Sequence, residues 1–211
     1  MLILCAGTAT EVGKTWVGAA TLRSLRDRGH TVSARKPAQS FDPADGQPLD
    51  AEILAEATGE PPAEVCRLDR TYAVAMAPPM AAAVLGEPPL TIAELLDELR
   101  WPEPAPAFRW LETVGGPRSP IAADADAVEL AHWLHPDLVV LVADAGLGTI
   151  NAVLLSRAPF VDQGYEPVVV LNRYDASNDL HRRNAEWLED AGVGVVLSVA
   201  ALVADLEALA R

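Results

Sequence analysis

The chain has 211 residues, half of them hydrophobic, and a formal net charge of −14. This length and apolar content predict a globular protein, folded as a single domain over residues 1–211, and exclude a disordered chain. Sixteen Lys and Arg residues against thirty Asp and Glu residues leave too little positive charge to bind nucleic acid or an anionic membrane surface.

The cysteines and the N-terminus predict a cytoplasmic protein. Cys5 and Cys66 show neither a metal-type spacing nor a disulfide framework, which fits a reducing compartment. The first residues lack the charged and long apolar regions of a signal peptide. No apolar run reaches the roughly 18 residues of a membrane-spanning helix, so no membrane partner is expected.

The stretch CAGTATEVGKT, from Cys5 to Thr15, joins a short apolar run to an amphipathic run. This order predicts a strand, a glycine-rich phosphate-binding loop (P-loop) and a helix. Lys14 would reach the β- and γ-phosphates of a nucleoside triphosphate, and the Thr15 hydroxyl would hold Mg²⁺. The first glycine of the motif is Gly7, one residue earlier than usual, so the loop is a longer variant. A simple strand-to-helix turn is the alternative interpretation.

Two charged residues follow the next strands. Lys36 comes after the strand at residues 30–35, and a residue at the carboxyl end of a parallel strand faces the ligand crevice. A solvated surface lysine is the alternative. Glu112 ends the strand at residues 107–112, ahead of paired glycines, where a P-loop protein needs a carboxylate for Mg²⁺. Without the paired glycines, Glu112 would be interpreted as an exposed surface residue without a role in binding.

A second glycine-containing turn, at residues 145–151, follows the apolar strand DLVVLVAD. Because the N–H groups at the start of a helix are unpaired, this helix N-terminus could hold an anion. The methionines Met76 and Met80 and the five tryptophans are interpreted as packing residues.

The elements alternate along the chain, which predicts an α/β fold with a doubly wound, mainly parallel sheet and helices on both faces, as in P-loop nucleotide-hydrolysing proteins. The expected strands lie at residues 2–6, 30–35, 107–112, 137–144, 166–171 and 193–199. The expected helices lie at residues 13–28, 49–58, 80–85, 91–100, 124–135, 151–164, 178–191 and 201–211, and residues 61–77 are expected to be irregular.

Four segments together resemble the ATP-dependent dethiobiotin synthetase family. They are Gly7–Thr15, Lys36-Pro37, the strand end from Glu112 to Gly116, and Gly148–Asn151, and their order and spacing match over roughly residues 2–175. The first is the most specific, since a Thr-x-x-Gly-Lys-Thr loop with a Glu before the Val is unusual among P-loops.

The resemblance implies a reaction. The family uses ATP and Mg²⁺ to join carbon dioxide to 7,8-diaminopelargonate and to close a ureido ring, a step of biotin synthesis. It also implies a homodimer and small-molecule substrates, namely the diamine, carbon dioxide and the nucleoside triphosphate. Chemistry of this kind depends on charge neutralisation and positioning more than on a covalent nucleophile.

The resemblance also implies roles for single residues. Lys14 and Lys36 would be catalytic and bind the carbamate from two sides. The Mg²⁺ ligands would be Thr15, Asp50 and Glu112; Asp50 on its own would read as a helix-dipole partner. The nucleotide would be bound by Glu11, Val12, Gly13, Lys14, Thr15 and, at the adenine, Asn172. The substrate would contact Thr10, Glu11 and Ser40, and its carboxylate would meet the backbone of Thr149, Ile150 and Asn151, reaching in from a second subunit.

The chain also departs from the family pattern. Thr113 and Val114 replace a glycine and an alanine after Glu112, Pro78-Pro79-Met80 replaces a Ser-Pro-His segment, and Ala152 replaces a histidine. These departures leave open a related P-loop enzyme with another amine substrate, or a catalytically impaired paralogue. A partner-binding ATPase switch of the partitioning type would carry a second lysine in the loop, and that position is Ala9.

Overall fold

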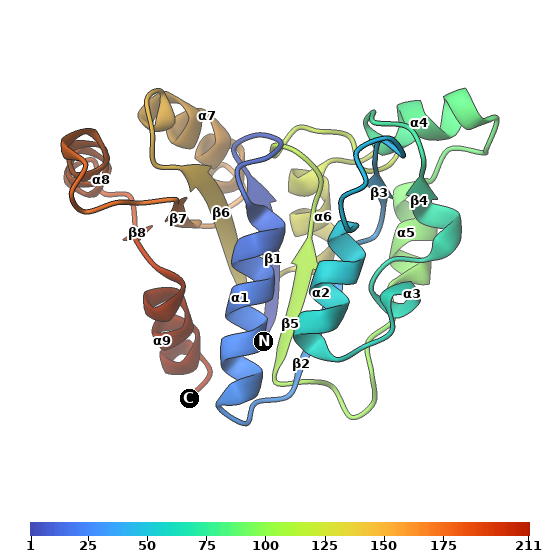
Figure 1. The fold of residues 1–211 in the computed structure, drawn as a ribbon, viewed down its shortest axis with the longest axis horizontal. Helices are drawn as coiled ribbons and strands as arrows, with labels where there is room; N and C mark the ends of the chain where they lie inside the picture. The colour runs from blue at the N-terminus through green and yellow to red at the C-terminus, as the bar shows by residue number, and fades with distance from the viewer.

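The computed structural model describes residues 1–211. Six parallel strands form the central sheet in the order β2-β5-β1-β6-β7-β8. The strands are β1 (Leu2–Gly7), β2 (Val32–Arg35), β5 (Phe108–Glu112), β6 (Leu138–Asp144), β7 (Val168–Asn172) and β8 (Val195–Val196). Helices cover both faces (Figure 1), so the predicted α/β fold with a parallel sheet is confirmed.

The position of strand β1 in the sheet explains why its sequence is apolar throughout. Successive side chains of a strand point to opposite faces, and both faces of this sheet are covered. Leu2, Leu4 and Ala6 accordingly belong to one core cluster, whereas Ile3 and Cys5 belong to the other. A strand with two buried faces has no polar alternation, which is what the run at residues 2–6 shows.

The helices divide between the two cores. One face is packed by α1 (Lys14–Asp27), α2 (Asp50–Thr58), the short α3 (Pro62–Val65) and α9 (Val199–Leu209). The other face is packed by α4 (Pro78–Leu85), α5 (Ile92–Glu98), α6 (Ala127–Leu134), α7 (Thr149–Val161) and α8 (Asp179–Asp190). Because the strands are parallel, their carboxyl ends meet at one edge, from which the loops into α1 and α7 emerge (Figure 1).

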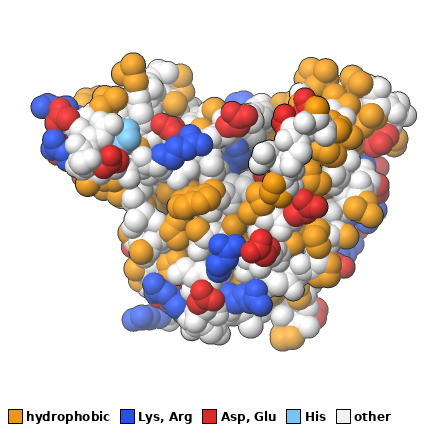
Figure 2. All heavy atoms as spheres, viewed as in Figure 1, with side chains coloured by type: hydrophobic (Ala, Val, Ile, Leu, Met, Phe, Trp, Pro, Cys, Tyr) orange, Lys and Arg blue, Asp and Glu red, His pale blue; other side chains and the backbone are white.

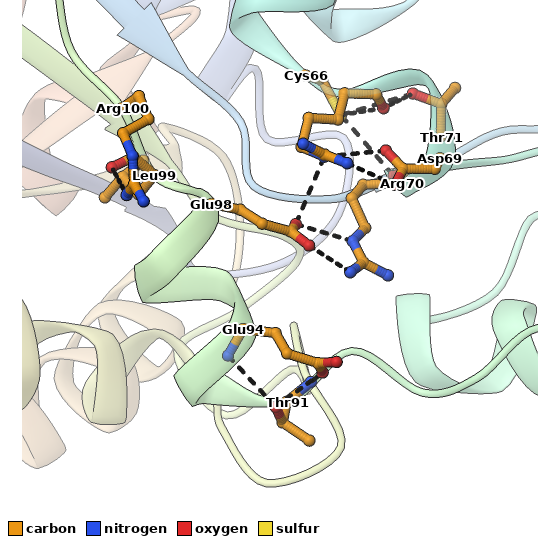
Figure 3. A network of polar contacts seen from close by, with 10 residues as sticks. Cys66, Asp69, Arg70, Thr71, Thr91, Glu94, Glu98, Leu99 and Arg100 are labelled. Carbon is orange, nitrogen blue, oxygen red and sulfur yellow. Dashed lines mark hydrogen bonds and ion pairs between the residues drawn. The ribbon is translucent and has the colours of Figure 1, made fainter.

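The segment 61–77 was expected to be irregular, and that expectation is partly wrong. It contains α3, a 3₁₀ turn at Leu68–Arg70 and β4 (Thr71–Tyr72), which pairs in parallel with β3 (Gln39–Ser40). These runs are too short for a hydrophobic period to show. Figure 3 shows how this part is held: Glu98 at the end of α5 accepts hydrogen bonds from the Arg70 guanidinium, at 2.9 Å from Nε.

The observed ends of helices and strands differ most from the expected ends in the C-terminal part of the chain. The strand expected at residues 193–199 is reduced to β8, and α9 begins at Val199, where the Ser198 hydroxyl accepts from Ala201 N–H as an N-cap. The helix expected from residue 80 starts at Pro78, a first-turn position that suits proline. A capping box of Thr91 and Glu94 opens α5 (Figure 3).

Several apolar residues interpreted as packing are exposed instead. That interpretation is wrong for Trp16, Trp133 and Trp187, and for Met76 and Met80 as well. Each lies on a helix or loop surface, and sequence period cannot show which face of an isolated helix will be covered. None of the helices combines the length and the apolar character needed to cross a membrane.

Candidate active site

The P-loop lies between β1 and α1 and needs glycine at both ends. A Cβ at Gly7 would lie 2.8 Å from a Val12 methyl and 2.9 Å from the Ala9 carbonyl oxygen, both too close. Gly13 has φ of 92°, and a Cβ there would collide with the Asn172 amide. The loop therefore turns tightly into α1, which leaves its first N–H groups free for an anion.

The two lysines of the chain both lie in this region, and both are buried. Lys14 Nζ donates to the Ala9 carbonyl oxygen at 3.2 Å, and burial lowers the pKa of this ammonium group. Lys36 Nζ lies 2.7 Å from Asp50 Oδ2 and 2.7 Å from Glu112 Oε1. Burial opposes its charge, but the two carboxylates outweigh burial and raise the pKa of Lys36. The alternative of a solvated surface Lys36 is therefore wrong.

Three oxygen-bearing side chains converge beside these lysines. Thr15 Oγ1 lies 2.8 Å from Asp50 Oδ1 and 2.7 Å from Glu112 Oε1. Glu112 is completely buried, and its second oxygen, Oε2, has no hydrogen-bond partner. An unpaired buried acceptor is costly, and a hard cation prefers such oxygen donors. The donor set fits Mg²⁺, which binds few protein ligands and keeps its other positions for water and phosphate.

A cavity of about 920 Å³ opens above the P-loop at the carboxyl edge of the sheet. Figure 2 shows the surface hollowed on this side, between the parts built around α7 and α4. The structure brings to this one cavity most of the residues predicted for phosphate, metal and diamine: Thr10, Glu11, Gly13, Lys14, Thr15, Lys36, Ser40 and Asp50. Val12 and Glu112 are buried and do not line it. The Ser40 hydroxyl donates to the Met76 carbonyl oxygen at 2.5 Å, which ties β3 to the segment before α4.

The altered loop after Glu112 has a local explanation. Thr113 is buried, and its hydroxyl donates to the Cys5 carbonyl oxygen at 3.1 Å, so this side chain turns away from the cavity. Val114 lines the cavity together with Ser119, whose Oγ accepts from Gly116 N–H at 2.9 Å. Sequence reasoning missed Ser119, because its approach to the glycines depends on how the loop folds back.

The second glycine-containing turn differs from the first. Gly148 has φ of 90° and precedes α7, and Leu147 before it is 91% exposed. Thr149 is buried, and its hydroxyl has no hydrogen-bond partner. Thr149, Ile150 and Asn151 do not line the cavity above the P-loop. Within one chain, the structure therefore does not bring these three predicted substrate contacts to the other site residues.

Asn172, at the end of β7, is tied to the P-loop. Its Nδ2 donates to the Val12 carbonyl oxygen at 2.9 Å. Beside it lies a second cavity, of about 510 Å³, that shares Gly13, Trp16 and Arg173 with the first cavity. Its other lining residues are mostly apolar: Val17, Val170, Leu171, Asn172, Tyr174, Leu197, Ser198 and Val199.

Arg173 is a further residue that sequence reasoning missed. Its guanidinium donates to the Glu11 carbonyl oxygen at 3.0 Å and to Asp144 Oδ2 at 2.8 Å. Both Glu11 and Arg173 have positive φ, 62° and 58°, which is uncommon for residues other than glycine. The only feature of the sequence that could have indicated a role for Arg173 is its position directly after Asn172.

The chain is similar to curated dethiobiotin synthetases along most of its length. The family model described as an AAA domain matches residues 2–206. The ATP-dependent dethiobiotin synthetase of Anaeromyxobacter dehalogenans is 37% identical, over 82% of this chain and 77% of that protein. The synthetase of Haloferax mediterranei is 36% identical, over 87% and 77%, and that of Aquifex aeolicus is 28% identical, over 90% and 84%.

Among solved structures, a plasmid partition protein of Borrelia burgdorferi bound to AMPPNP matches with a TM-score of 0.55 and 11% identity, over 99% of this chain and 96% of that one. The signal recognition particle receptor of Elizabethkingia anophelis matches with a TM-score of 0.51 and 15% identity, over 100% and 65%. These two likenesses show the fold alone. The sequence relationships show more, and they confirm the resemblance noted above: the chain belongs to the ATP-dependent dethiobiotin synthetase family.

Proposed function

We propose that this protein carboxylates 7,8-diaminopelargonate with carbon dioxide and closes the ureido ring of dethiobiotin, using ATP and Mg²⁺, in biotin synthesis. The observation that carries the proposal is the meeting of Lys14, Lys36, Thr15 and Asp50 at one P-loop cavity, with the buried Glu112 carboxylate in contact with Thr15 and Lys36, in a member of this family. The reaction develops negative charge on a carbamate and on a transferring phosphoryl group, and buried cations are what such charge requires.

The P-loop and the start of α1 would bind the phosphates of ATP. The N–H groups at the start of α1 and the Lys14 ammonium would bind the β- and γ-phosphates. Because burial lowers the pKa of Lys14, an anion beside it would offset the burial and hold the proton on Nζ. Glu11, Val12 and Gly13 would contribute their backbone to the same cradle.

Thr15, Asp50 and Glu112 would hold the Mg²⁺. Glu112 Oε2, which has no hydrogen-bond partner, would be available as a ligand atom. When bound there, Mg²⁺ neutralises charge on the β- and γ-phosphates of ATP. Thr15 positions its hydroxyl by its place in the first turn of α1, and Glu112 and Asp50 face it from β5 and α2.

Lys36 would bind the carbamate. One amine of the diamine attacks carbon dioxide, giving a carbamate and releasing a proton. The carbamate oxygen then takes the γ-phosphoryl group, and ADP leaves. The second amine attacks the same carbon and displaces phosphate, which closes the ring. Since Asp50 and Glu112 raise the pKa of Lys36, its ammonium group is charged and can hold the negative oxygen in place.

The diamine would lie against Thr10, Glu11 and Ser40, which line the cavity. Its carboxylate would bind the N–H groups of Thr149, Ile150 and Asn151 from a second subunit, in a homodimer. One observation supports a second copy: these residues do not line the cavity of their own chain. Mixing a Lys36→Ala protein with one carrying Ile150→Asp and Asn151→Asp tests this, since each could supply what the other lacks.

The adenine would lie in the cavity of about 510 Å³ beside Asn172. Because Asn172 Nδ2 already donates to Val12, the amide oxygen is what remains to accept from an exocyclic amine such as that of adenine. A cytoplasmic location is part of the proposal, and the free thiols of Cys5 and Cys66 are compatible with it.

The test is direct. The protein is incubated with diaminopelargonate, bicarbonate, MgCl₂ and ATP, and dethiobiotin, ADP and phosphate are measured, with Lys14→Ala as the inactive control. One ADP and one phosphate should appear for each dethiobiotin. ATP binding without dethiobiotin would contradict the proposal and favour the related enzyme with another amine or the impaired paralogue. The Ser40 hydroxyl already bonded to Met76 and the Pro78-Pro79-Met80 segment are the features that would then explain it.

A further inference from the structure

Trp16 occupies an unusual position for a tryptophan. It lies in the first turn of α1, directly after the P-loop threonine, and it is 59% exposed. The next residue, Val17, is completely buried in the core under α1, so the helical period turns Trp16 away from that core. Its ring forms none of the aromatic pairs found in the structure. A large apolar surface is therefore left open at the mouth of the P-loop.

The two cavities meet at this side chain. Trp16, Gly13 and Arg173 line both the cavity above the P-loop and the cavity between α1, the end of β7 and the start of α9. A triphosphate held by Gly13, Lys14 and Thr15 has its nucleoside end free to enter the second cavity. The volume of that cavity, about 510 Å³, and its apolar lining are typical of a small-molecule site.

We propose that Trp16 is the stacking surface of the nucleobase, and that it makes this enzyme favour purine over pyrimidine nucleoside triphosphates. This inference rests on the proposed ATP-dependent function and adds a specificity-determining residue to it. Asn172 reads the polar edge of a base, whereas an indole contacts its face. The larger face of a purine covers more of the indole than a pyrimidine does, so the contact carries a size preference.

The size of the effect follows from other aromatic contacts to bases. Removing an aromatic side chain that stacks on a base weakens binding by about tenfold to a hundredfold. The chain offers a matched control in Trp187, an exposed tryptophan on α8 that lines neither cavity. A loss specific to Trp16 would separate stacking from the general effect of deleting a surface tryptophan.

The experiment compares ligands with and without a base. Dissociation constants for ATP, CTP and inorganic tripolyphosphate, each with Mg²⁺, are measured for the wild type, Trp16→Ala, Trp16→Phe and Trp187→Ala. We expect Trp16→Ala to weaken ATP about tenfold, to weaken CTP less and to leave tripolyphosphate unchanged. Trp16→Phe should keep most of the ATP affinity, and Trp187→Ala should match the wild type. ATP should quench tryptophan fluorescence in the wild type and in Trp187→Ala, but not in Trp16→Phe.

The outcomes distinguish the stacking role of Trp16 from the proposed function of the protein. If Trp16→Ala weakens ATP and tripolyphosphate equally, Trp16 supports the P-loop and does not stack on the base, so the inference is wrong. Unchanged ATP affinity in Trp16→Ala overturns it as well, while dethiobiotin formation by the wild type would leave the proposed function standing. A wild type that binds no ATP at all would overturn both.

Discussion

Two strand-to-helix turns lie at the carboxyl edge of the sheet, one after β1 and one after the neighbouring strand β6. Each ends in a glycine in the left-handed region, Gly13 at φ 92° and Gly148 at φ 90°, and each opens a helix with free N–H groups. The first turn is surrounded by buried charge: Lys14, Lys36 and Glu112. The second has a buried, unpaired Thr149 hydroxyl and an exposed Leu147 instead.

The difference indicates what each turn can bind alone. Around the first turn, charges from α1, α2, β5 and the residue after β2 balance one another within one chain, so this half of the site is assembled before any ligand arrives. The second turn has its backbone dipole and the exposed Asp144–Arg173 pair, with no buried charged side chain beside it, which suits a single carboxylate and a partner surface. We infer that the first turn carries the chemistry and the second only positions the substrate.

The largest expected effect is at Lys36. Lys36→Ala should lower kcat by about 10²- to 10³-fold, as loss of one donor to a transition-state oxyanion does. It also leaves Glu112 buried without its cation, so the variant should unfold at a lower temperature without Mg²⁺ than with it. Turnover and thermal unfolding with and without MgCl₂ measure the two effects. Normal turnover by Lys36→Ala would remove the carbamate role and much of the contrast between the turns.

A smaller effect, on stability alone, is expected at Glu60. Its carboxylate accepts from Ser33 Oγ at 2.7 Å, Arg35 Nη1 at 2.8 Å and Ala34 N–H at 2.9 Å, and so holds the edge strand β2 that ends just before Lys36. Burial opposes the charge, but these donors outweigh burial and lower the pKa of Glu60. Glu60→Gln should reduce the free energy of unfolding by about 2 kcal/mol at pH 7, the size expected for a hydrogen bond to a charged group.

The pH dependence of the Glu60 effect follows from the sign of the shift. A carboxyl with a lowered pKa stabilises the fold above its unfolded value, near 4.5, and loses that contribution as the pH falls below it. Denaturation curves of the wild type and Glu60→Gln should therefore converge as the pH falls from about 4.5 through the lowered pKa of Glu60. Glu56→Gln is the matched control, because its contact with Arg23 is at 3.6 Å and exposed. A constant difference across pH would mean that the charge of Glu60 is not what stabilises β2.

The second turn is tested by a charge that favours folding and opposes binding. Asn151 is exposed in the first turn of α7, where an acidic side chain stabilises the helix dipole. Asn151→Asp should raise KM for the diamine about tenfold, since a like charge near 4 Å costs about 1 kcal/mol or more. The unfolding temperature and KM for ATP should stay the same, and Asn151→Gln should behave as the wild type. An unchanged KM for the diamine in Asn151→Asp would place the substrate carboxylate elsewhere.

These two turns also show how much of the site could be predicted from the sequence. The P-loop and Glu112 could be predicted because parallel strands bring their carboxyl ends to one edge, whatever the packing around them. Asp50 could not be assigned from its own pattern, since an acidic first-turn residue suits any helix; its contact with Thr15 depends on how α2 packs against α1. The chain has two lysines, and both lie at the site, a signal in the composition that the motif search did not use.

The surroundings of Trp16 and Arg173 could not be predicted from the sequence for a different reason. Their environment is made by β7 and α9, which are remote in the sequence from the P-loop and end in short, weakly patterned segments. The strand expected at residues 193–199 is reduced to β8, and Leu197, Ser198 and Val199, where the chain turns into α9, line the second cavity.

The smallest expected effect lies between the two turns, at Arg173. Its guanidinium donates to Glu11 in the first turn and to Asp144, whose Oδ1 accepts from Gly146 N–H in the second, so one side chain links both. Burial opposes the charge of Asp144, but Arg173 and Gly146 lower its pKa, so this link stays charged at neutral pH.

Because the Arg173 pair is exposed, its loss should cost at most about 1 kcal/mol. We expect Arg173→Ala to raise KM for ATP a few-fold through a looser Glu11, while the unfolding temperature and KM for the diamine stay constant. Arg182→Ala, an exposed arginine on α8 that pairs with Asp179, is the control for charge alone. If Arg173→Ala raised both KM values together, the turns would work as one unit, and the division between a chemical turn and a positioning turn would fail.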